Sequence, residues 1–183
     1  MWLSSPIRAR IVNVVASFYF PHRIDVHQLA EALGAELVSM SRKGYLVAAR
    51  VMVGNAYLLV YHTGRVVCVG ATSEREVRAA ARKLVEALKS KGFLVQENGL
   101  DVKVLNVVAS VELGHPLDIE SLAERLERCI YEPEIFPGLI LSDRWTYLVF
   151  ANGKVNVVGM KSESELGQAV SHLMELIGQP RRA

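Results

Sequence analysis

The sequence contains asparagine and basic side chains at matching positions of repeated apolar segments, and their types and spacing suggest that they bind a ligand. Asn13 lies in the run Ile11-Val-Asn-Val-Val-Ala-Ser17, and Asn106 lies in the run Val104-Leu-Asn-Val-Val-Ala-Ser110. An amide side chain both donates and accepts hydrogen bonds, and cations such as Arg65 and Lys154 attract phosphate or carboxylate groups. Such groups, placed alike on apolar segments, predict a binding surface.

Residues that commonly catalyse reactions do not form a recognisable group in this sequence. No Ser/His/Asp grouping and no phosphate-binding glycine loop occurs, and the histidines are not spaced as metal ligands. Each histidine is interpreted as a surface or turn residue: His22, His27, His62, His115 and His172. We therefore predict that the chain is not an enzyme and needs no cofactor or metal.

Length and composition are typical of a soluble globular protein. The chain has 183 residues, of which 51% are hydrophobic and 22% charged, so it can bury a sizeable core. No apolar run reaches the ~20 residues that cross a bilayer, and the opening MWLSSPIRAR lacks the features of a secretory signal. Cys68 and Cys129 lie in apolar surroundings, which predicts buried free thiols in a reducing cytoplasm.

Charge is distributed unevenly between the two halves of the chain. Residues 1–92 contain 13 Lys and Arg against 6 Asp and Glu, whereas residues 93–183 contain 8 against 13. One interpretation is chance combined with solvated helix faces. The other is a basic half that binds a polyanion and an acidic half that binds a basic partner.

An internal repeat organises the sequence. Besides the two asparagine-containing runs, Leu59-Val-Tyr-His-Thr-Gly-Arg65 returns as Leu148-Val-Phe-Ala-Asn-Gly-Lys154. The runs that follow, Val66-Val-Cys-Val-Gly70 and Val155-Asn-Val-Val-Gly159, also match. Several similar blocks in the same order predict two diverged copies of one α+β unit, residues 1–92 and 93–183, joined head to tail.

Each copy is predicted to begin with a strand and a short helix. The strands are residues 10–17 and 103–111, and the helices are Val26–Leu33 and Ile119–Leu126, each preceded by an Asp at the N-cap position. Further strands are predicted at residues 45–53, 56–62, 65–70, 138–142, 146–151 and 154–159, with hairpin turns at His62-Thr-Gly64 and Ala151-Asn-Gly153.

A long amphipathic helix is predicted to close each copy. Ser73 with Glu76, and Ser162 with Glu165, have the spacing of capping boxes. Apolar stripes at helical spacing follow them, formed by Val77, Ala80, Ala81, Leu84, Val85 and Leu88 and by Leu166, Val170, Leu173, Met174 and Ile177. These stripes predict helices that cover one face of a sheet.

The other face of the sheet is predicted to bind a ligand. If Val12, Val14 and Ala16 face the helices, strand alternation places Asn13, Val15 and Ser17 on the opposite side. The same alternation places Val67, Val69, Asn156 and Val158 there, with Arg65 and Lys154. An apolar surface with interspersed amides and cations is typical of a binding site. A further domain or a dimer mate that covers this face is the alternative.

One string makes the chain resemble a known family. Tyr131-Glu-Pro-Glu-Ile-Phe-Pro-Gly138, together with the Asn-Val-Val-Ala-Ser openers and the Gly-(Lys/Arg) hairpins, is similar to the TATA-box binding protein core in its archaeal form. The resemblance spans roughly residues 8–178. It implies an α+β fold, a pseudo-two-fold saddle of two repeats with one curved antiparallel β-sheet and four helices on the convex face.

The resemblance also implies a function. Members of this family are general transcription initiation factors that bind A/T-rich promoter DNA in the minor groove, bend it, and recruit transcription factor B and RNA polymerase. The implied location is the cytoplasm of an archaeal cell, in association with the nucleoid. The resemblance leaves open a homodimer in the absence of DNA.

Pattern and resemblance together give the expected DNA-contacting residues. Phe136 and Phe150 resemble the pair that opens one end of the DNA site, and Tyr45 with Tyr61 would be the first-copy pair, although Gly44 aligns almost as well as Tyr45. The expected base, groove and phosphate contacts are Asn13, Val15, Tyr45, Arg50, Leu59, Tyr61, Arg65, Val67, Val69, Asn106, Val108, Phe136, Leu148, Phe150, Lys154, Asn156, Val158 and Lys161. The residues expected to bind transcription factor B are Glu132, Glu134 and Ile135.

Two departures from the family pattern support a second hypothesis. The first copy lacks the Tyr-x-Pro-Glu-x-Phe-Pro-Gly string, and Val69 and Val158 stand where the family usually has a threonine that bonds a base. Valine keeps the shape of threonine but loses its hydroxyl donor. The alternative is therefore a divergent paralogue that acts as a protein-interaction module, with weak or lost sequence-specific DNA binding.

Overall fold

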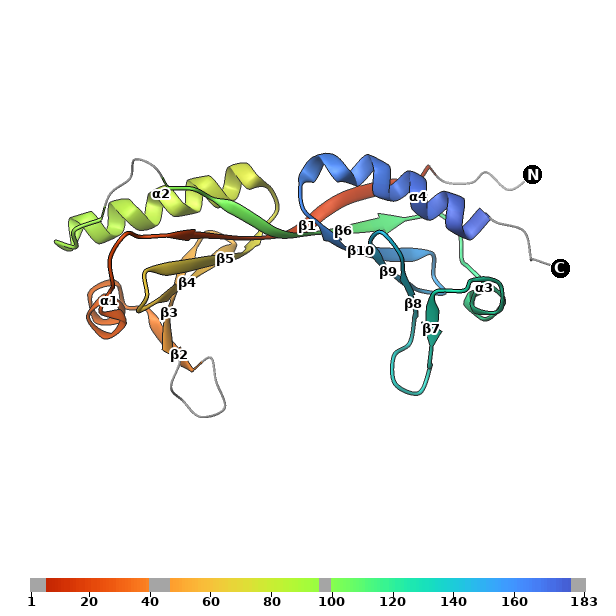
Figure 1. Ribbon diagram of the computed structural model, residues 1–183, viewed down its shortest axis with the longest axis horizontal. Helices are drawn as coiled ribbons and strands as arrows, with labels where there is room; N and C mark the ends of the chain where they lie inside the picture. The colour runs from red at the N-terminus through yellow and green to blue at the C-terminus, as the bar shows by residue number, and fades with distance from the viewer. Residues whose placement is uncertain (1–5, 40–46, 96–99, 179–183) are drawn as a thin grey trace. The chain divides into compact units, whose positions relative to one another are not determined.

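The computed structural model describes residues 6–39, 47–95 and 100–178. These residues contain ten strands and four α-helices (Figure 1). The chain divides into two compact units, the first formed by Asn13–Leu105 and the second by Met1–Val12 with Asn106–Ala183. Strands β1 (Arg8–Tyr19) and β6 (Lys103–Glu112) each contribute residues to both units.

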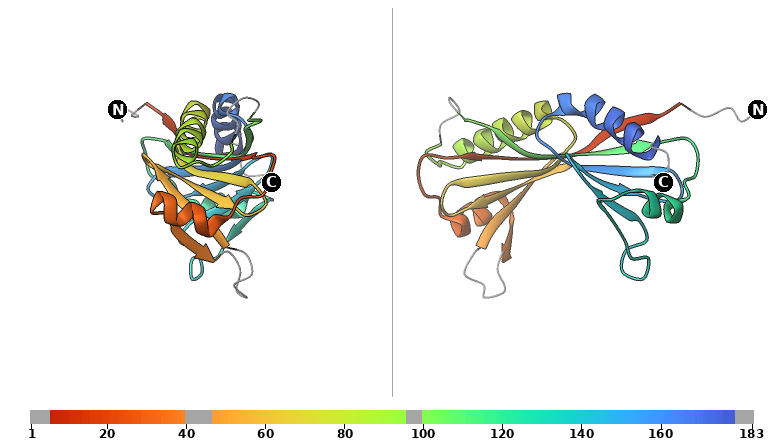
Figure 2. Two further views of the ribbon diagram at one scale, coloured as in Figure 1. Left: turned by 90° about the vertical axis from the view of Figure 1, so that its left-hand side faces the viewer. Right: turned by 45° about the vertical axis from the view of Figure 1, so that its right-hand side comes forward.

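The first unit is an antiparallel sheet packed against two helices. Its hydrogen-bonded strand order is β2-β3-β4-β5-β1. Helix α1 packs against β3, and the longer α2 packs against β3, β4 and β5 (Figures 1 and 2). The elements besides β1 are α1 (Val26–Leu33), β2 (Glu36–Ser39), β3 (Val47–Val53), β4 (Ala56–Tyr61), β5 (Arg65–Ala71) and α2 (Glu74–Ser90).

The second unit repeats this arrangement. Its strand order, β6-β10-β9-β8-β7, is the counterpart of β1-β5-β4-β3-β2, and its pairings are antiparallel. Besides β6 it contains α3 (Ile119–Arg125), β7 (Cys129–Tyr131), β8 (Leu139–Ser142), β9 (Thr146–Val149), β10 (Lys154–Met160), the short 3-10 helix η1 (Glu163–Glu165) and α4 (Leu166–Gly178). The repeated sequence blocks thus fold into the same strand connections.

The predicted long strands and all four helices are confirmed to within a few residues at their ends. Strands β2 and β7 were not predicted, because runs of four and three residues are too short to show an alternating pattern. Each of them is the last strand of its unit in hydrogen-bond order.

Side-chain burial follows the predicted stripes closely in one helix and loosely in the other. Every member of the predicted α2 stripe is buried. In α4 only Leu173 of the predicted stripe is buried, together with Ala169, whereas the other members are half-buried. Val14 and Ala16 are fully buried as predicted, but Val12 is 36% exposed, so its placement against the helices was wrong.

Helix capping is confirmed at three of the four predicted N-caps. Asp25 and Asp118 accept backbone hydrogen bonds from the first turns of α1 and α3, and Ser73 accepts one from the Glu76 N–H. Glu76 reaches back to the Thr72 N–H at 2.7 Å. The capping box at Ser162 was wrong.

At the start of η1 the Ser162 side chain makes no capping bond. The Glu165 carboxylate accepts instead from the Trp145 indole N–H at 2.8 Å and from the Lys161 backbone N–H at 3.0 Å. The hydrogen bond from Trp145, more than any other cause, lowers the pKa of Glu165. The glutamate thus ties the start of this helix to the turn before β9.

A hairpin glycine in each copy accepts a hydrogen bond from the segment that follows the first strand. Phe20 N–H donates to the Gly64 carbonyl at 2.9 Å, and Leu113 N–H donates to the Gly153 carbonyl at 3.0 Å. Both glycines have positive φ, 86° and 81°. A Cβ at Gly153 would clash with the His115 backbone carbonyl, which no side-chain rotation can relieve.

Gly153→Ala is expected to destabilise the protein by about 3 kcal/mol or more, because it adds a backbone clash to the strain of a positive φ. The matched control is Gly92→Ala, at φ 82° with no atom within 4 Å of the added methyl. It should cost only roughly 1 kcal/mol. Urea unfolding of the three proteins measures both values, and equal losses would contradict the role of the close contact.

Candidate nucleic-acid interface

One face of the second unit gathers the predicted contact residues. Asn156 of β10 pairs directly with Leu148 of β9 and Ser110 of β6, and Val158 pairs with Val108 and Thr146. Directly paired residues share a face of the sheet. These side chains are half-buried. Val155 and Val157, which alternate with Asn156 and Val158 along β10, are fully buried. The side chains of Asn156, Val158, Val108 and Leu148 therefore form one continuous, partly open surface.

The first unit carries a matching surface. Val67 of β5 pairs with Leu59 of β4, and Leu59 pairs in turn with Arg50 of β3. Val69 pairs with Tyr57, a half-buried aromatic that the sequence reasoning missed. Alternation with Leu59 and Tyr61 along β4 was the signal that could have found it. Leu59 itself is 8% exposed, so it supports this surface more than it is presented on it.

The paired asparagines are held in the same way in both units. The Gly70 N–H donates to Asn13 Oδ1 at 2.9 Å, and the Gly159 N–H donates to Asn106 Oδ1 at 2.9 Å. A backbone N–H only donates, so each amide must turn its oxygen inward and leave its NH₂ group as a donor for another partner. Both glycines have positive φ, 90° and 102°, which glycine adopts readily.

Phe136 and Phe150 lie in contact, although the sequence separates them by the whole of β8 and β9. Their ring centroids are 5.6 Å apart with an interplanar angle of 57°. Gly138 makes room for the pair, because a Cβ there would lie 2.9 Å from Phe136 and 3.1 Å from Phe150. The Phe-Pro-Gly sequence thus builds a half-buried aromatic pair beside the surface of the second unit.

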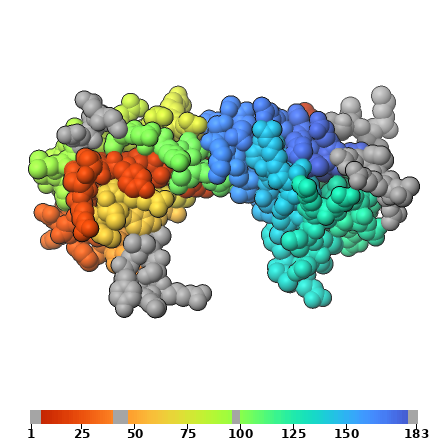
Figure 3. All heavy atoms as spheres, viewed as in Figure 1, coloured from red at the N-terminus to blue at the C-terminus, as the bar shows by residue number. Residues whose placement is uncertain are grey.

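Glu132, Glu134 and Ile135 lie in the loop between β7 and β8, which protrudes from the second unit (Figures 1 and 3). All three are exposed, and the Ile135 side chain is 80% exposed. The N–H groups of Ile135 and Phe136 both donate to the Glu132 carbonyl at 2.9 Å. This turn thus exposes two carboxylates and one apolar side chain together.

The predicted cations differ in their surroundings. Arg65 and Lys154 are exposed at the starts of β5 and β10. Arg50 is exposed but forms an ion pair with Glu36 on the neighbouring strand. Lys161 is exposed at the entry to η1.

Tyr45 lies outside the described residues, whereas Tyr61 and Val15 are half-buried.

The two cysteines differ in burial. Cys68 is a free, buried cysteine as predicted, and burial raises the pKa of its thiol to about 11. Cys129 is only half-buried, so its predicted burial was wrong, and its thiol lies 3.1 Å from the Leu126 carbonyl. Among the described residues no cluster of His, Cys, Asp and Glu could hold a metal ion. No helix in the described part of the chain is long and apolar enough to span a membrane.

Comparison with known proteins identifies the family. A family model described as "Transcription factor TFIID (or TATA-binding protein, TBP)" matches residues 8–91 and 101–179. The chain belongs to the TATA-binding protein family. The TATA-box-binding protein of Methanocaldococcus jannaschii is 36% identical to it, over 92% of each chain. That of Archaeoglobus fulgidus is 35% identical, over 92% of this chain and 93% of the relative.

A solved structure of a TATA-binding protein supports the same assignment. The structure of Methanococcus jannaschii TBP matches with a TM-score of 0.79 and 34% identity, covering 93% of this chain and 98% of that chain. The match confirms the predicted fold class, α+β with four helices and an open antiparallel sheet. The family consists of DNA-binding transcription factors and not of enzymes, so the chain has a general transcription factor role and binds promoter DNA.

Proposed function

We propose that the chain initiates transcription by binding A·T-rich promoter DNA in the minor groove, bending it, and recruiting transcription factor B and RNA polymerase. The observation that carries the proposal is the repeated pair of asparagines, each turned by a glycine N–H so that its NH₂ group is left as a donor. In the minor groove, A·T pairs present only acceptors, namely adenine N3 and thymine O2. Donors from Asn13 and Asn106 match these acceptors.

The valine-rich surroundings of the asparagines support discrimination against G·C pairs. A G·C pair adds the guanine amino group to the minor groove. Val158 and Val108 on the second unit, and Val67 on the first, offer that donor no partner. An unsatisfied buried donor costs about 1–3 kcal/mol. The surface therefore favours A·T-rich DNA, because binding to a G·C pair would leave the guanine amino group without an acceptor.

The Phe136 and Phe150 pair supports bending. Apolar side chains that enter a base step in the minor groove unstack it and kink the duplex toward the major groove. Gly138 leaves space for the two rings to lie in contact beside the apolar strands, so we propose that they act as one wedge. Arg65, Lys154 and Lys161 then supply phosphate contacts, whereas Arg50 must leave Glu36 before it can do so.

The loop of Glu132, Glu134 and Ile135 is the proposed site for transcription factor B. Two exposed carboxylates precede an isoleucine that is 80% exposed. The two carboxylates would attract a basic partner, and the Ile135 side chain would supply apolar contact area when that partner buries it. We propose that residues 1–92 and 93–183 are the two repeats, that both contribute to the DNA surface, and that only the second carries this loop. Promoter binding would locate the chain at the nucleoid.

A fluorescence anisotropy titration with a TATA-containing duplex, at several salt concentrations and with or without transcription factor B, tests the proposal. We expect saturable binding. The logarithm of the binding constant should fall linearly with the logarithm of the salt concentration, because phosphate contacts release counterions. A G·C-substituted duplex is the control and should bind with lower affinity. No binding at low salt, even with the factor present, would overturn the proposal.

Phe136→Ala is expected to reduce DNA bending far more than nonspecific association, because it removes the wedge but no phosphate contact. Energy transfer between dyes at the two ends of the duplex measures the bend. Phe136→Leu keeps an apolar side chain and should retain part of the bend. Equal losses of bending and nonspecific affinity would contradict the wedge role.

Glu132→Arg is expected to leave binary DNA binding nearly unchanged and to prevent the ternary complex, because it places a like charge against the basic factor. The matched control is Glu120→Arg, the same charge change on an exposed residue of α3. A supershift assay with transcription factor B compares the two. A ternary complex that survives Glu132→Arg would remove this loop from the proposal.

Val69 and Val158 favour a second candidate function, a protein-interaction module with weak or lost sequence-specific DNA binding. Both residues lie on the proposed DNA surface without a hydroxyl donor. The titration separates the candidates, because such a module would bind the factor but not distinguish the TATA duplex from its G·C control.

A further inference from the structure

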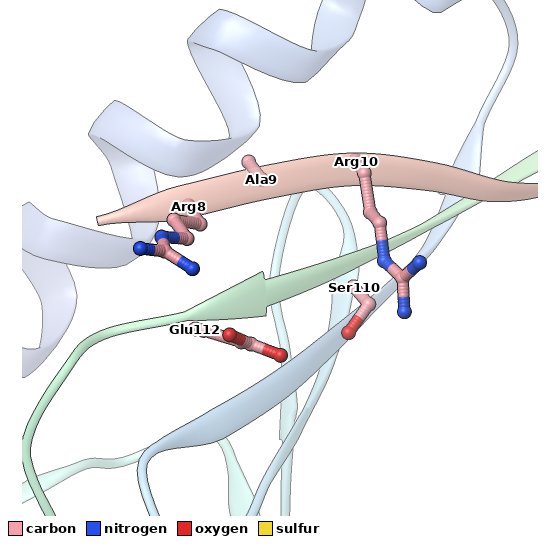
Figure 4. A pocket seen from close by; sticks show the side chains of 5 residues that line it. All are labelled: Arg8, Ala9, Arg10, Ser110 and Glu112. Atoms are coloured by element: carbon pink, nitrogen blue, oxygen red, sulfur yellow. The ribbon is translucent and has the colours of Figure 1, made fainter. Parts of the chain in front are cut away.

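A cavity on the second unit lies beside the proposed DNA surface and is lined by two arginines that are not among the proposed DNA contacts. It has a volume of about 280 Å³ and is lined by Arg8, Ala9 and Arg10 of β1 and by Ser110 and Glu112 of β6. In Figure 4 the side chains of Arg8 and Arg10 extend toward Ser110 and Glu112, whereas Ala9 points to the opposite side of β1. The two arginines thus occupy one face of the strand, as alternation requires.

The charge of this cavity favours an anion. Arg8 and Arg10 are exposed, and neither forms an ion pair with another described residue. Glu112 is the single acidic lining residue, and it pairs across the strands with Lys154. The lining residues with Lys154 therefore carry three cations against one carboxylate. Two guanidinium groups beside a serine hydroxyl provide several donors for phosphate oxygens.

The cavity continues the surface that carries the asparagines. Asn106, Val108, Ser110 and Glu112 alternate along β6 and so share one face. Ser110 pairs directly with Asn156 of β10. A duplex that contacts Asn106 and Asn156 would therefore bring its backbone toward the cavity.

We propose that Arg8 and Arg10, with the Ser110 hydroxyl, bind backbone phosphate of the promoter duplex, and that Glu112 limits the strength of this contact by repulsion. The inference rests on the proposed DNA-binding function and adds to it a phosphate site in which the first strand of one repeat serves the surface of the other. It adds affinity without reading sequence, because phosphate contacts position a protein on the duplex and base contacts specify the site.

The salt dependence of DNA binding tests this site. In the full chain, Arg8→Gln with Arg10→Gln should make the slope of log K against log salt shallower by about two units, since each phosphate contact contributes roughly 0.9. The loss should be equal for TATA and G·C-substituted duplexes, so their affinity ratio stays constant. Glu112→Gln should have the opposite effect and tighten binding to both duplexes.

Arg75→Gln with Arg78→Gln on α2 is the matched control, because it makes the same charge change at exposed arginines outside the cavity. A slope that is unchanged by the Arg8 and Arg10 substitutions, or changed as much by the control, would overturn the site. If the unaltered chain fails to bind the TATA duplex, the proposed function fails instead.

Free phosphate is the other source of the same ligand chemistry. In NMR titrations of the arginine side-chain N–H signals, duplex DNA at micromolar concentration should shift Arg8 and Arg10, and inorganic phosphate at the same concentration should not. Equal shifts with both ligands would overturn the assignment to DNA backbone.

Discussion

The hydrogen bond between a glycine N–H and an asparagine carbonyl oxygen, made once in each unit, determines what the rest of the structure can do. It runs from Gly70 to Asn13 and from Gly159 to Asn106, and both bonds are 2.9 Å long. Each bond requires the first and last strands of a repeat to lie side by side, with the glycine at a positive φ. The remaining strands and helices make that adjacency stable, since the buried face of each sheet supplies the core. The unburied face then presents amide donors among valines, which is the chemistry of A·T recognition in a minor groove.

Glycines serve the second unit in two further ways that depend on close approach. Gly138 lets the Phe136 and Phe150 rings come together, and Gly153 lets the chain after β6 pass close to the β9–β10 turn. In both places the available space, more than the backbone angle alone, excludes a larger residue. The first unit keeps the turn contact at Gly64 but carries Tyr61 at the position that matches Phe150. The two repeats therefore share their framework and differ in the side chains that would act on DNA.

The electrostatic features show a similar division between framework and function. Arg50 is held by Glu36 within the first unit, whereas Arg8 and Arg10 have no ion-pair partner among the described residues. Surface ion pairs contribute little stability, so Arg50 could leave Glu36 at small cost to make the proposed DNA contact. The exposed loop of Glu132, Glu134 and Ile135 carries opposite charge. The cationic strands and the acidic loop therefore match the two partners proposed for the chain, DNA and a basic protein.

The sequence by itself determined the repeat, the long strands, the four helices and the residues that share each face, because these follow from periodicity and turn residues close together in the chain. It did not determine the partners of polar groups. Ser162 and Glu165 have the spacing of a capping box, yet Glu165 bonds Trp145, twenty residues away in sequence. Asn13 and Gly70 are 57 residues apart, and Arg8 and Arg10 share a cavity with residues of β6. Such contacts were decided only by the tertiary structure, since a hydrogen bond needs atoms within about 3 Å, and only the pairing of strands and the packing of helices bring those segments together.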